Sequence, residues 1–285
     1  MPELPEVENV RRTLIKAKTI KQTIQKVEIY NNKLIKGIEE KEFVDLLLGQ
    51  TIHNIERKGK YLFFILDTHV LVNHLRMTGK YFLEEKLLSP HHKRAVYLTF
   101  HLSNQQKLIY SDLRGFGIFH LQPLTAYQKL EPYKKIGKDL LNEEIDPAYL
   151  FEYYQKDKSP IKITLLEQDI ISGIGNIYAS EILFAAKIHP LKITQTLTFQ
   201  EVERILNFTK AILQKATELG GTSVVDFVNP FFSFFLRQTK NTTKPINPAA
   251  PIPAGIIICQ GVPSFLPLPE LGEEISADLV VGEED

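Results

Sequence analysis

A succession of short apolar runs between about Thr51 and Leu121 constrains the fold of this chain most strongly. No helix-length segment is interposed between them, which is typical of a β-sandwich or a β-barrel. The runs are rich in β-branched and aromatic residues and are separated by turn residues, as expected for strands. Four of them stand out: 61–66, 70–72, 95–100 and 107–110.

Helical patterns flank this strand-rich region. Apolar residues recur at helical spacing from Glu6 to Ala17. After Pro123, two segments begin with a capping residue followed by proline, at Asp146 and at Ser159, and the second is expected to end near Gln168. Two further helices are expected at 176–186 and at 198–219, where a pair of glycines follows.

These patterns predict an α+β protein in three parts. The predicted parts are a β-sandwich domain with an N-terminal helix at 1–135, a helical domain at 136–235, and a tail of different composition at 236–285.

The composition, with 44% hydrophobic and 24% charged residues, is that of a globular protein. No segment approaches the length of a membrane span, and the N-terminus shows no secretory signal pattern. A single cysteine, Cys259, excludes an internal disulfide framework and a cysteine-rich metal site. We therefore expect a cytoplasmic protein with no membrane partner.

The formal net charge of zero conceals an uneven distribution. All 34 lysines and arginines lie at or before Lys244, whereas seven of the 34 acidic residues lie after it. Residues 1–244 therefore carry 34 basic against 27 acidic side chains. This excess suggests a polyanionic partner, although an ordinary solvated surface would also explain it.

The N-terminal octapeptide, Met-Pro-Glu-Leu-Pro-Glu-Val-Glu, contains a compact set of reactive groups. Removal of Met1 would leave Pro2 with a secondary amine that can attack an electrophilic carbon and form an iminium. An α-amino group has a pKa of about 7.7–8.0, so a usable fraction is neutral at physiological pH. Glu3 beside it can serve as general acid or base. The alternative is that the segment is a solvated cap on the following helix.

Three motifs in the strand-rich region have both an ordinary and a functional interpretation. Lys60 follows a glycine turn at the start of a strand, where a lysine is usually solvated. Met77 ends a strand in His-Leu-Arg-Met-Thr-Gly, where it would pack in the core or at the rim. Phe116 lies near Arg114 in a glycine-containing loop, where it would plug the core. Functionally, Phe116 could wedge between DNA bases while Arg114 fills the vacated space.

A fourth motif, Gly-Ile-Gly-Asn-Ile-Tyr-Ala at 173–179, places a glycine turn before a helix. The free N–H groups of such a helix bind an anion, for which phosphate is the natural candidate. Lys162 on the preceding helix could help to hold a DNA backbone. The motif lacks the spacing of a dinucleotide-binding loop.

Taken together and in order, these motifs resemble the formamidopyrimidine-DNA glycosylase family. The match extends to about residue 229 and includes Ile188-His-Pro190 and Leu219-Gly-Gly-Thr222. Leu4 resembles the residue found in the formamidopyrimidine-DNA glycosylase branch, whereas the endonuclease VIII branch usually has glycine at this position. The resemblance implies an N-terminal β-sandwich and a C-terminal helical domain with a helix–two-turn–helix motif. It also implies a monomeric enzyme that removes oxidised purines (8-oxoguanine, formamidopyrimidines) from double-stranded DNA and cleaves the strand by β- or β,δ-elimination.

The same resemblance implies a role for each candidate residue. Pro2 would form the Schiff base with the sugar C1′, Glu3 would be the acid and base that opens the sugar, and Lys60 would contact phosphate and assist elimination. A second group would fill and wedge the gap left by the flipped base: Met77, Arg114 and Phe116. A third would hold the backbone or the lesion nucleotide: His92, Lys158, Lys162 and Asn176.

The tail departs from the family pattern, which usually ends in a zinc finger with two Cys-x-x-Cys pairs. The four corresponding positions carry Ile246, Ala249, Leu266 and Pro269, so no tetrahedral zinc site is possible and we expect no cofactor. Gly261 stands where an arginine normally touches DNA, and the lesion-covering loop after Asn229 is short. The tail is either a natural zincless finger that packs through apolar residues or a degraded or frame-shifted end.

Three functions therefore compete. The first is a bifunctional glycosylase and abasic-site lyase for oxidised purines. The second is a protein that binds damaged or abasic DNA but has reduced or lost turnover, because the finger and the lesion loop are degenerate. The third is a Schiff-base enzyme for small carbonyl compounds, which the wedge residues disfavour because a small-molecule pocket needs no wedge.

Overall fold

The computed structural model describes residues 1–84 and 87–221 of the chain. The tail predicted for 236–285 and the end of the predicted helical domain lie outside these residues. None of the helices in the described ranges is long and apolar enough to cross a membrane.

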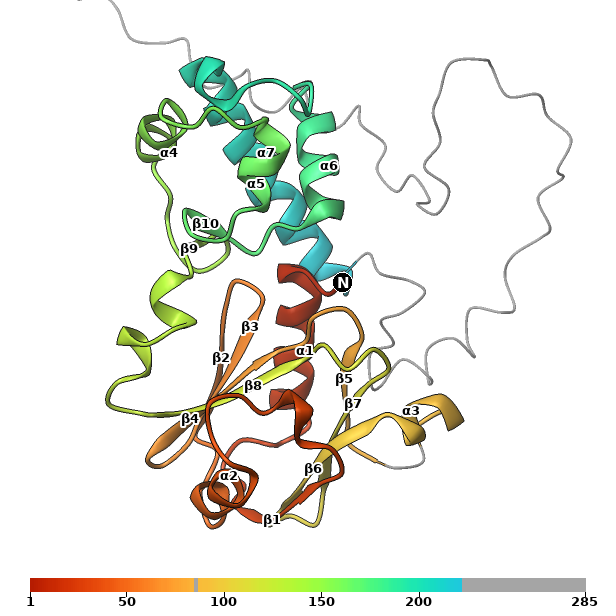
Figure 1. Ribbon diagram of the computed structural model, residues 1–285. Coiled ribbons are helices and arrows are strands. Elements are labelled where there is room, and N and C mark those ends of the chain that lie inside the picture. The colour runs from red at the N-terminus through yellow and green to blue at the C-terminus, as the bar shows by residue number, and fades with distance from the viewer. Residues whose placement is uncertain (85–86, 222–285) are drawn as a thin grey trace, which may run out of the picture. The chain divides into compact units, whose positions relative to one another are not determined.

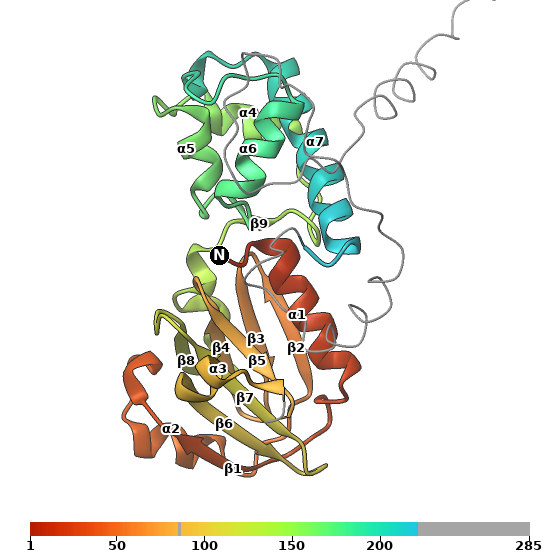
Figure 2. The ribbon, with the colours of Figure 1, turned by 90° about the vertical axis from the view of Figure 1, so that its right-hand side faces the viewer.

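Two four-stranded antiparallel sheets form the N-terminal part (Figures 1 and 2). The first sheet has the strand order β1 (Ile24–Ile29), β6 (Val96–Leu102), β7 (Lys107–Asp112) and β5 (Gly79–Phe82). The second has the order β2 (Asn54–Lys58), β3 (Tyr61–Ile65), β4 (His69–His74) and β8 (Ile118–Pro123).

The main core contains buried side chains from both sheets. Phe100 and Tyr110 come from the first sheet, and Phe64 and Phe119 from the second. Because each strand turns alternate side chains inward, two such sheets bury a shared apolar layer. The predicted β-sandwich is therefore confirmed.

Three helices accompany the sandwich: α1 (Leu4–Lys16), α2 (Glu40–Leu47) and the short α3 (Pro90–Arg94). Helix α1 begins two residues before the predicted start, because Glu3 and Glu6 form a capping box at its N-terminus. Val10 and Leu14 of α1 belong to the sandwich core, whereas Leu4 belongs to the core of the helical part. The first turn of α1 thus contributes to both cores.

The helical part contains the predicted helices, with small shifts at their ends. They are α4 (Pro147–Tyr154), α5 (Ile161–Leu166), α6 (Asn176–Ala185) and α7 (Phe199–Glu218). Helix α5 ends before the predicted Gln168, because Glu167 already has an extended backbone. Two short parallel strands, β9 (Lys138–Asp139) and β10 (Ile171–Ser172), lie beside these helices. Helix α5 carries Lys162, and helix α6 begins directly after the glycine turn of the 173–179 motif.

Candidate active site

Pro2 and Glu3 are buried where α1 begins, and Met1 before them is 37% exposed. While Met1 is attached, the Pro2 nitrogen is an amide and is not nucleophilic. Removal of Met1 converts it into the amine that the sequence predicts as the nucleophile.

The Glu3 carboxylate is held by backbone N–H groups at the N-terminus of α6. Its Oε2 atom accepts hydrogen bonds from Gly175 N at 2.6 Å and Tyr178 N at 3.4 Å, and Oε1 accepts one from Ile177 N at 3.0 Å. These amides have no partner within the helix, and the helix dipole favours a negative charge there. The acidic side chain next to Pro2 is thereby fixed in place.

Burial raises the pKa of the Glu3 carboxyl above its ordinary value, and the bonds from Ile177 and Gly175 and the charge of Lys60 oppose this rise. A raised pKa makes a carboxyl better suited to general acid–base catalysis, which is most efficient when the pKa of the group is close to the operating pH. The environment of Glu3 therefore suits the acid–base role predicted for it.

Gly175 allows Glu3 to approach the helix this closely. A Cβ atom at position 175 would lie 2.3 Å from Glu3 Cδ, which is far too short for a real contact. The second glycine of the 173–179 motif thus leaves room for a carboxylate of the chain itself. The sequence predicted phosphate as the anion at this helix terminus, and in the structure the carboxylate of Glu3 occupies it.

Lys60 reaches the same turn from the sandwich. Its Nζ donates a hydrogen bond to Ile174 O at 2.6 Å, and its side chain is buried rather than solvated. Burial lowers the pKa of Lys60 to about 8, although Glu3 and Glu6 act in the opposite direction. The structure thus brings together Glu3 and Lys60, which lie far apart in the sequence, at the first residues of α6.

A buried ion-pair network, which the sequence analysis did not single out, holds the β2–β3 turn that carries Lys60. Arg57, whose side chain is fully buried, donates to Glu8 Oε2 at 3.1 Å and forms a two-pronged pair with Asp139. Asp139 also accepts a bond from Gly59 N at 2.7 Å. Burial alone would raise the pKa of Glu8, but the neighbouring arginines lower it to about 2. The turn before Lys60 is therefore tied to both α1 and β9.

His74 is a second buried polar residue near Lys60 that sequence reasoning missed. Burial, together with the charges of Arg76 and Lys60, lowers the pKa of His74 to about 3, so its ring is neutral. Its Nδ1 atom accepts a hydrogen bond from Arg76 N at 2.9 Å. The proton of the neutral ring then resides on Nε2, which makes that atom a donor. Its place at the head of the His-Leu-Arg-Met-Thr-Gly motif was the available signal.

Met77, Arg114 and Phe116 lie on two exposed loops of the sandwich. Met77 is 37% exposed in the turn between β4 and β5, and Phe116 is 48% exposed in the loop between β7 and β8. The Arg114 guanidinium lies 5.0 Å from the centre of the Phe116 ring. This exposure contradicts the alternative in which Phe116 plugs the core.

Buried Asp112 joins these two loops, and it was also missed from sequence. One carboxylate oxygen accepts bonds from Phe116 N at 2.9 Å and Gly117 N at 2.7 Å. The other accepts bonds from Arg114 N and from the Thr78 hydroxyl, next to Met77. An aspartate at a strand end before a glycine-rich loop was the only signal in the sequence. We refer to residues 76–79 and 113–117 as the wedge loops.

The other predicted DNA-binding residues are distributed over three elements. Asn176 is the exposed first residue of α6, and Ser180 Oγ donates to its carbonyl at 3.0 Å and accepts from Lys162 Nζ at 3.0 Å. Lys158 is exposed before α5, and His92 lies on α3 with its Nδ1 atom 2.7 Å from Ser89 Oγ. The structure thus groups Asn176 with Lys162, while no contact among the described residues links Lys158 or His92 to them.

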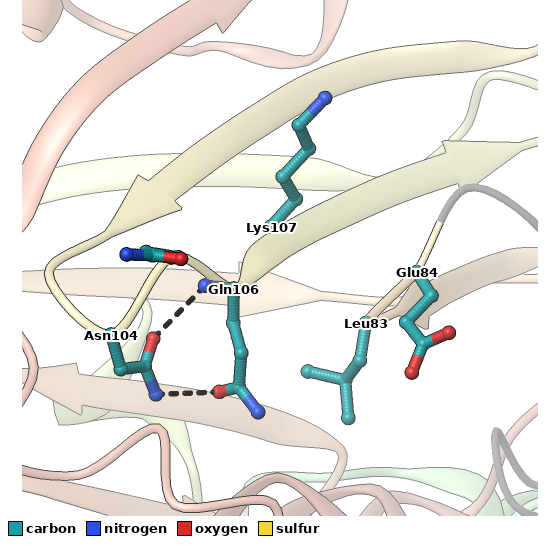
Figure 3. A pocket seen from close by; sticks show the side chains of 6 residues that line it. Leu83, Glu84, Asn104, Gln106 and Lys107 are labelled. Atoms are coloured by element: carbon teal, nitrogen blue, oxygen red, sulfur yellow. Dashed lines mark hydrogen bonds between the residues drawn. The ribbon is translucent and has the colours of Figure 1, made fainter.

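A surface pocket at the β6–β7 hairpin is separate from all of these residues (Figure 3). Its polar side chains satisfy one another, since Asn104 Nδ2 donates to Gln106 Oε1 at 2.8 Å. It has no side chain suited to nucleophilic or acid–base catalysis beyond Glu84 and Lys107 at its rim. The full lining is Leu83, Glu84, Asn104, Gln105, Gln106 and Lys107.

Comparison with known proteins agrees with this two-part architecture. The sequence model of the formamidopyrimidine-DNA glycosylase N-terminal domain matches residues 1–119, and that of the formamidopyrimidine-DNA glycosylase H2TH domain matches 136–228. The formamidopyrimidine-DNA glycosylase of Oceanobacillus iheyensis is 39% identical over 232 residues, which cover 80% of this chain and 81% of that protein. The formamidopyrimidine-DNA glycosylase of Exiguobacterium sibiricum is 38% identical over 235 residues, which cover 81% of this chain and 83% of that protein.

Solved structures give the same result. A mutant of the Lactococcus lactis enzyme in complex with a Fapy-dG containing DNA superposes with a TM-score of 0.73 at 38% identity, covering 79% of this chain and 82% of that one. The Lactococcus lactis protein in complex with an abasic site containing DNA superposes with a TM-score of 0.71 at 38% identity, covering 78% of this chain and 80% of that one. The fold and the site thus define a two-domain protein of the DNA-glycosylase class. The chain belongs to the formamidopyrimidine-DNA glycosylase family.

Proposed function

We propose that the chain is a bifunctional DNA glycosylase and abasic-site lyase that acts on oxidised purines in double-stranded DNA. The observation that carries this proposal is the convergence of Glu3 and Lys60 on the first residues of α6, directly beside Pro2. This arrangement places an acid–base group and a cation where an N-terminal amine would form. A cytoplasmic location fits a DNA substrate and a chain with one cysteine.

In the proposed reaction, the lone pair of the Pro2 amine forms a bond to the sugar C1′, and the damaged base leaves with the electron pair of the glycosidic bond. The departing base takes up a proton, and the Pro2 nitrogen, now bonded to C1′, loses its own proton to solvent. The freed lone pair on nitrogen then forms the C=N bond as the C1′–O4′ bond opens and Glu3 protonates the ring oxygen, which yields an iminium between Pro2 and C1′. The iminium acidifies C2′, so loss of a C2′ proton expels the 3′ phosphate with the electron pair of the C3′–O3′ bond. The damaged nucleotide must first leave the base stack to expose C1′.

Lys60 and His74 would hold the phosphate next to the reacting sugar. Both are buried polar groups, and Lys60 acts electrostatically on Glu3 as well as on His74. A cation and a neutral N–H donor both bind phosphate oxygens. The wedge loops would fill the space of the flipped nucleotide, and Asn176 with Lys162 would contact the backbone farther along. Lys158 and His92 are proposed as further backbone contacts because of their charge or donor capacity.

The zinc site of the family does not fit this chain. The residues at the four ligand positions are Ile246, Ala249, Leu266 and Pro269, whose side chains have no donor atom. They lie outside the described residues, and no step of the proposed reaction passes through a metal. We expect that treatment with a chelator leaves the activity unchanged.

Borohydride trapping tests the proposal directly. Protein with Met1 removed is incubated with duplex DNA that contains 8-oxoguanine or an abasic site, and the reduced covalent adduct is measured. We expect the adduct with wild type, and a rate at least about 100-fold lower for Glu3→Gln because proton transfer is removed. Glu152→Gln, which changes an exposed glutamate on α4, should match wild type.

The second candidate, a binding-only protein, is favoured by the sequence of the tail, where Gly261 replaces the family's DNA-touching arginine. It predicts affinity for abasic DNA without adduct and without strand cleavage. A wild-type protein that binds such DNA but forms no adduct would reject the enzymatic proposal.

A further inference from the structure

The hydroxyl group of Tyr110 lies directly beneath both wedge loops. A Cβ atom built at Gly79 or at Gly117 would lie 2.1 Å from the Tyr110 oxygen. Gly79 ends the turn that carries Met77, and Gly117 ends the loop that carries Phe116. The backbones of both loops therefore rest against a single oxygen atom, and each has glycine at the point of contact.

The position of this oxygen is fixed by the sandwich core. The Tyr110 side chain is fully buried, and its ring packs edge-on against Tyr81 at 5.2 Å and against Phe119 at 4.8 Å between ring centres. These neighbours come from β5 and β8, the strands that the two loops lead into. Because close-packed rings leave no room for the ring to shift, the oxygen acts as a rigid stop.

Burial raises the pKa of the Tyr110 hydroxyl overall, although the Asn73 side chain is close enough to the hydroxyl to lower that pKa. The Tyr110 hydroxyl has no hydrogen-bond partner among the described residues. The nearby side chain of Asn73 accepts from the Tyr81 hydroxyl and donates to Ile118 O. A buried hydroxyl without a partner lowers stability, so the contact with the two glycines is the clear structural effect of this oxygen.

We infer that Tyr110 is a positioning residue, whose hydroxyl sets the height and separation of Met77 and Phe116. Asp112 links the two loops by hydrogen bonds, and contact with the Tyr110 oxygen prevents their backbones from moving toward the core. Both tips then enter the base stack at the same depth. The inference rests on the proposed function, because it concerns how that reaction obtains a flipped nucleotide.

The test is Tyr110→Phe, which removes only the oxygen. Trapping is measured on a duplex with an abasic site and on a single strand with the same site. We expect the duplex rate to fall about tenfold, since displaced wedges unstack the bases poorly. The single-strand rate should match wild type, because that lesion is already unstacked, and the melting temperature should be equal or higher.

Tyr154→Phe is the matched control. Tyr154 lies in the core of the helical part, and its buried hydroxyl also lacks a partner among the described residues. Its loss should leave both trapping rates unchanged. A similar fall for both variants on the duplex would show that the effect does not depend on the wedge loops.

A second variant tests the steric contact itself. Gly117→Ala should slow duplex trapping because the new methyl group meets the Tyr110 oxygen, and adding Tyr110→Phe should restore part of the rate. Such a departure from additivity is the signature of two groups in contact. Equal duplex rates for wild type and Tyr110→Phe, or an equal fall on both substrates, would overturn the inference. Absence of trapping by wild type would instead reject the proposed function.

Discussion

The proposed reacting centre around Glu3 and Lys60 and the wedge loops are built in opposite ways. Glu3 and Lys60 are buried charges. The backbone partners of Glu3 on α6 lie 172 to 175 residues away in the sequence, and that of Lys60 lies 114 residues away. Met77 and Phe116 are exposed apolar tips, and the loops that carry them are anchored by Asp112 within 34 residues. A buried charge needs partners from distant segments, whereas an exposed tip needs only a rigid local base. Changes at the centre should therefore alter folding or chemistry, and changes at the tips should alter only the handling of duplex DNA.

The largest expected effect comes from the ion-pair network beneath the centre. Asp139→Asn leaves Arg57 buried without its full partner, which should lower the free energy of unfolding by about 3–5 kcal/mol. Urea denaturation measures this loss. Asp146→Asn is the matched control, because asparagine caps a helix as well as aspartate does. Equal stability of the two variants would show that the network does not support the centre.

Gly175→Ala should slow the reaction, whereas a glycine substitution away from the site should lower only stability. The new Cβ displaces the Glu3 carboxylate, and a misplacement of about 1 Å can slow a reaction about 100-fold. Single-turnover trapping on abasic DNA measures the rate. Gly49→Ala, at a glycine with φ of 80° and open space around it, should cost stability but leave trapping intact. A trapping rate for Gly175→Ala close to that of wild type would disprove the tight fit.

The lowered pKa of Lys60 predicts that the affinity for abasic DNA depends on pH through this one side chain. The ammonium that would bind phosphate is lost as pH rises through about 8, so affinity for abasic DNA should fall by up to about tenfold per pH unit above that value. Lys60→Arg should abolish this dependence, because arginine stays charged. Fluorescence anisotropy between pH 7 and pH 9.5 provides the measurement.

The same shift has a consequence for stability with a defined sign. Between the folded pKa of about 8 and the ordinary value of 10.5, the unfolded chain retains a proton that the folded chain has lost. The contribution of Lys60 to the free energy of unfolding therefore increases with pH across this window. A contribution that decreases there, measured as the difference between wild type and Lys60→Arg, would contradict the burial of an ammonium.

The smallest effect on folding is expected at the tip of a wedge loop. Phe116→Ala should change stability by less than about 0.5 kcal/mol, because the ring is half exposed. It should slow trapping on duplex abasic DNA while leaving the single-strand rate unchanged. Leu113→Ala, in the same loop and equally exposed, should affect neither substrate. A matching loss for Leu113→Ala would show that the loop acts through bulk rather than through its aromatic tip.

Much of the fold could be predicted from local pattern. The runs that became β3, β4, β6 and β7 are strongly apolar, and the side chains of Asp146 and Thr198 cap α4 and α7. The predicted cap of α5 at Ser159 was wrong, because its N-cap residue is Pro160 and has no capping side-chain bond. Helices α2 and α3 were not identified, nor were strands β1, β2, β5, β8, β9 and β10. In β1 and β2 charged residues interrupt the apolar ones, because these strands expose one face to solvent.

Candidate site residues could be predicted where the reactive groups stand together in a short sequence motif. They could not be predicted where distant residues become buried partners only in the fold. Pro2, Glu3 and Lys60 stand in short motifs whose reactive groups can be read directly. Arg57 and Asp139 have the sequence appearance of ordinary surface charges, and only the fold brings them together across 82 residues. The orientation of Glu3 toward the glycine turn could not be foreseen either, since a helix terminus binds external and internal anions equally well.

The hydrogen bonds between Glu3 and α6 also affect when Met1 can be removed during synthesis. The carboxylate at position 3 gains its partners on α6 only after residue 177 has been made, which at a synthesis rate of about 5–20 residues per second takes roughly 10 to 35 seconds. Throughout this interval the N-terminal segment is open to an aminopeptidase, and once α6 has formed Pro2 is buried. Formation of the proposed Pro2 nucleophile therefore depends on whether Met1 is removed before the helical part is complete. A chain that folds before it loses Met1 would keep its amine blocked.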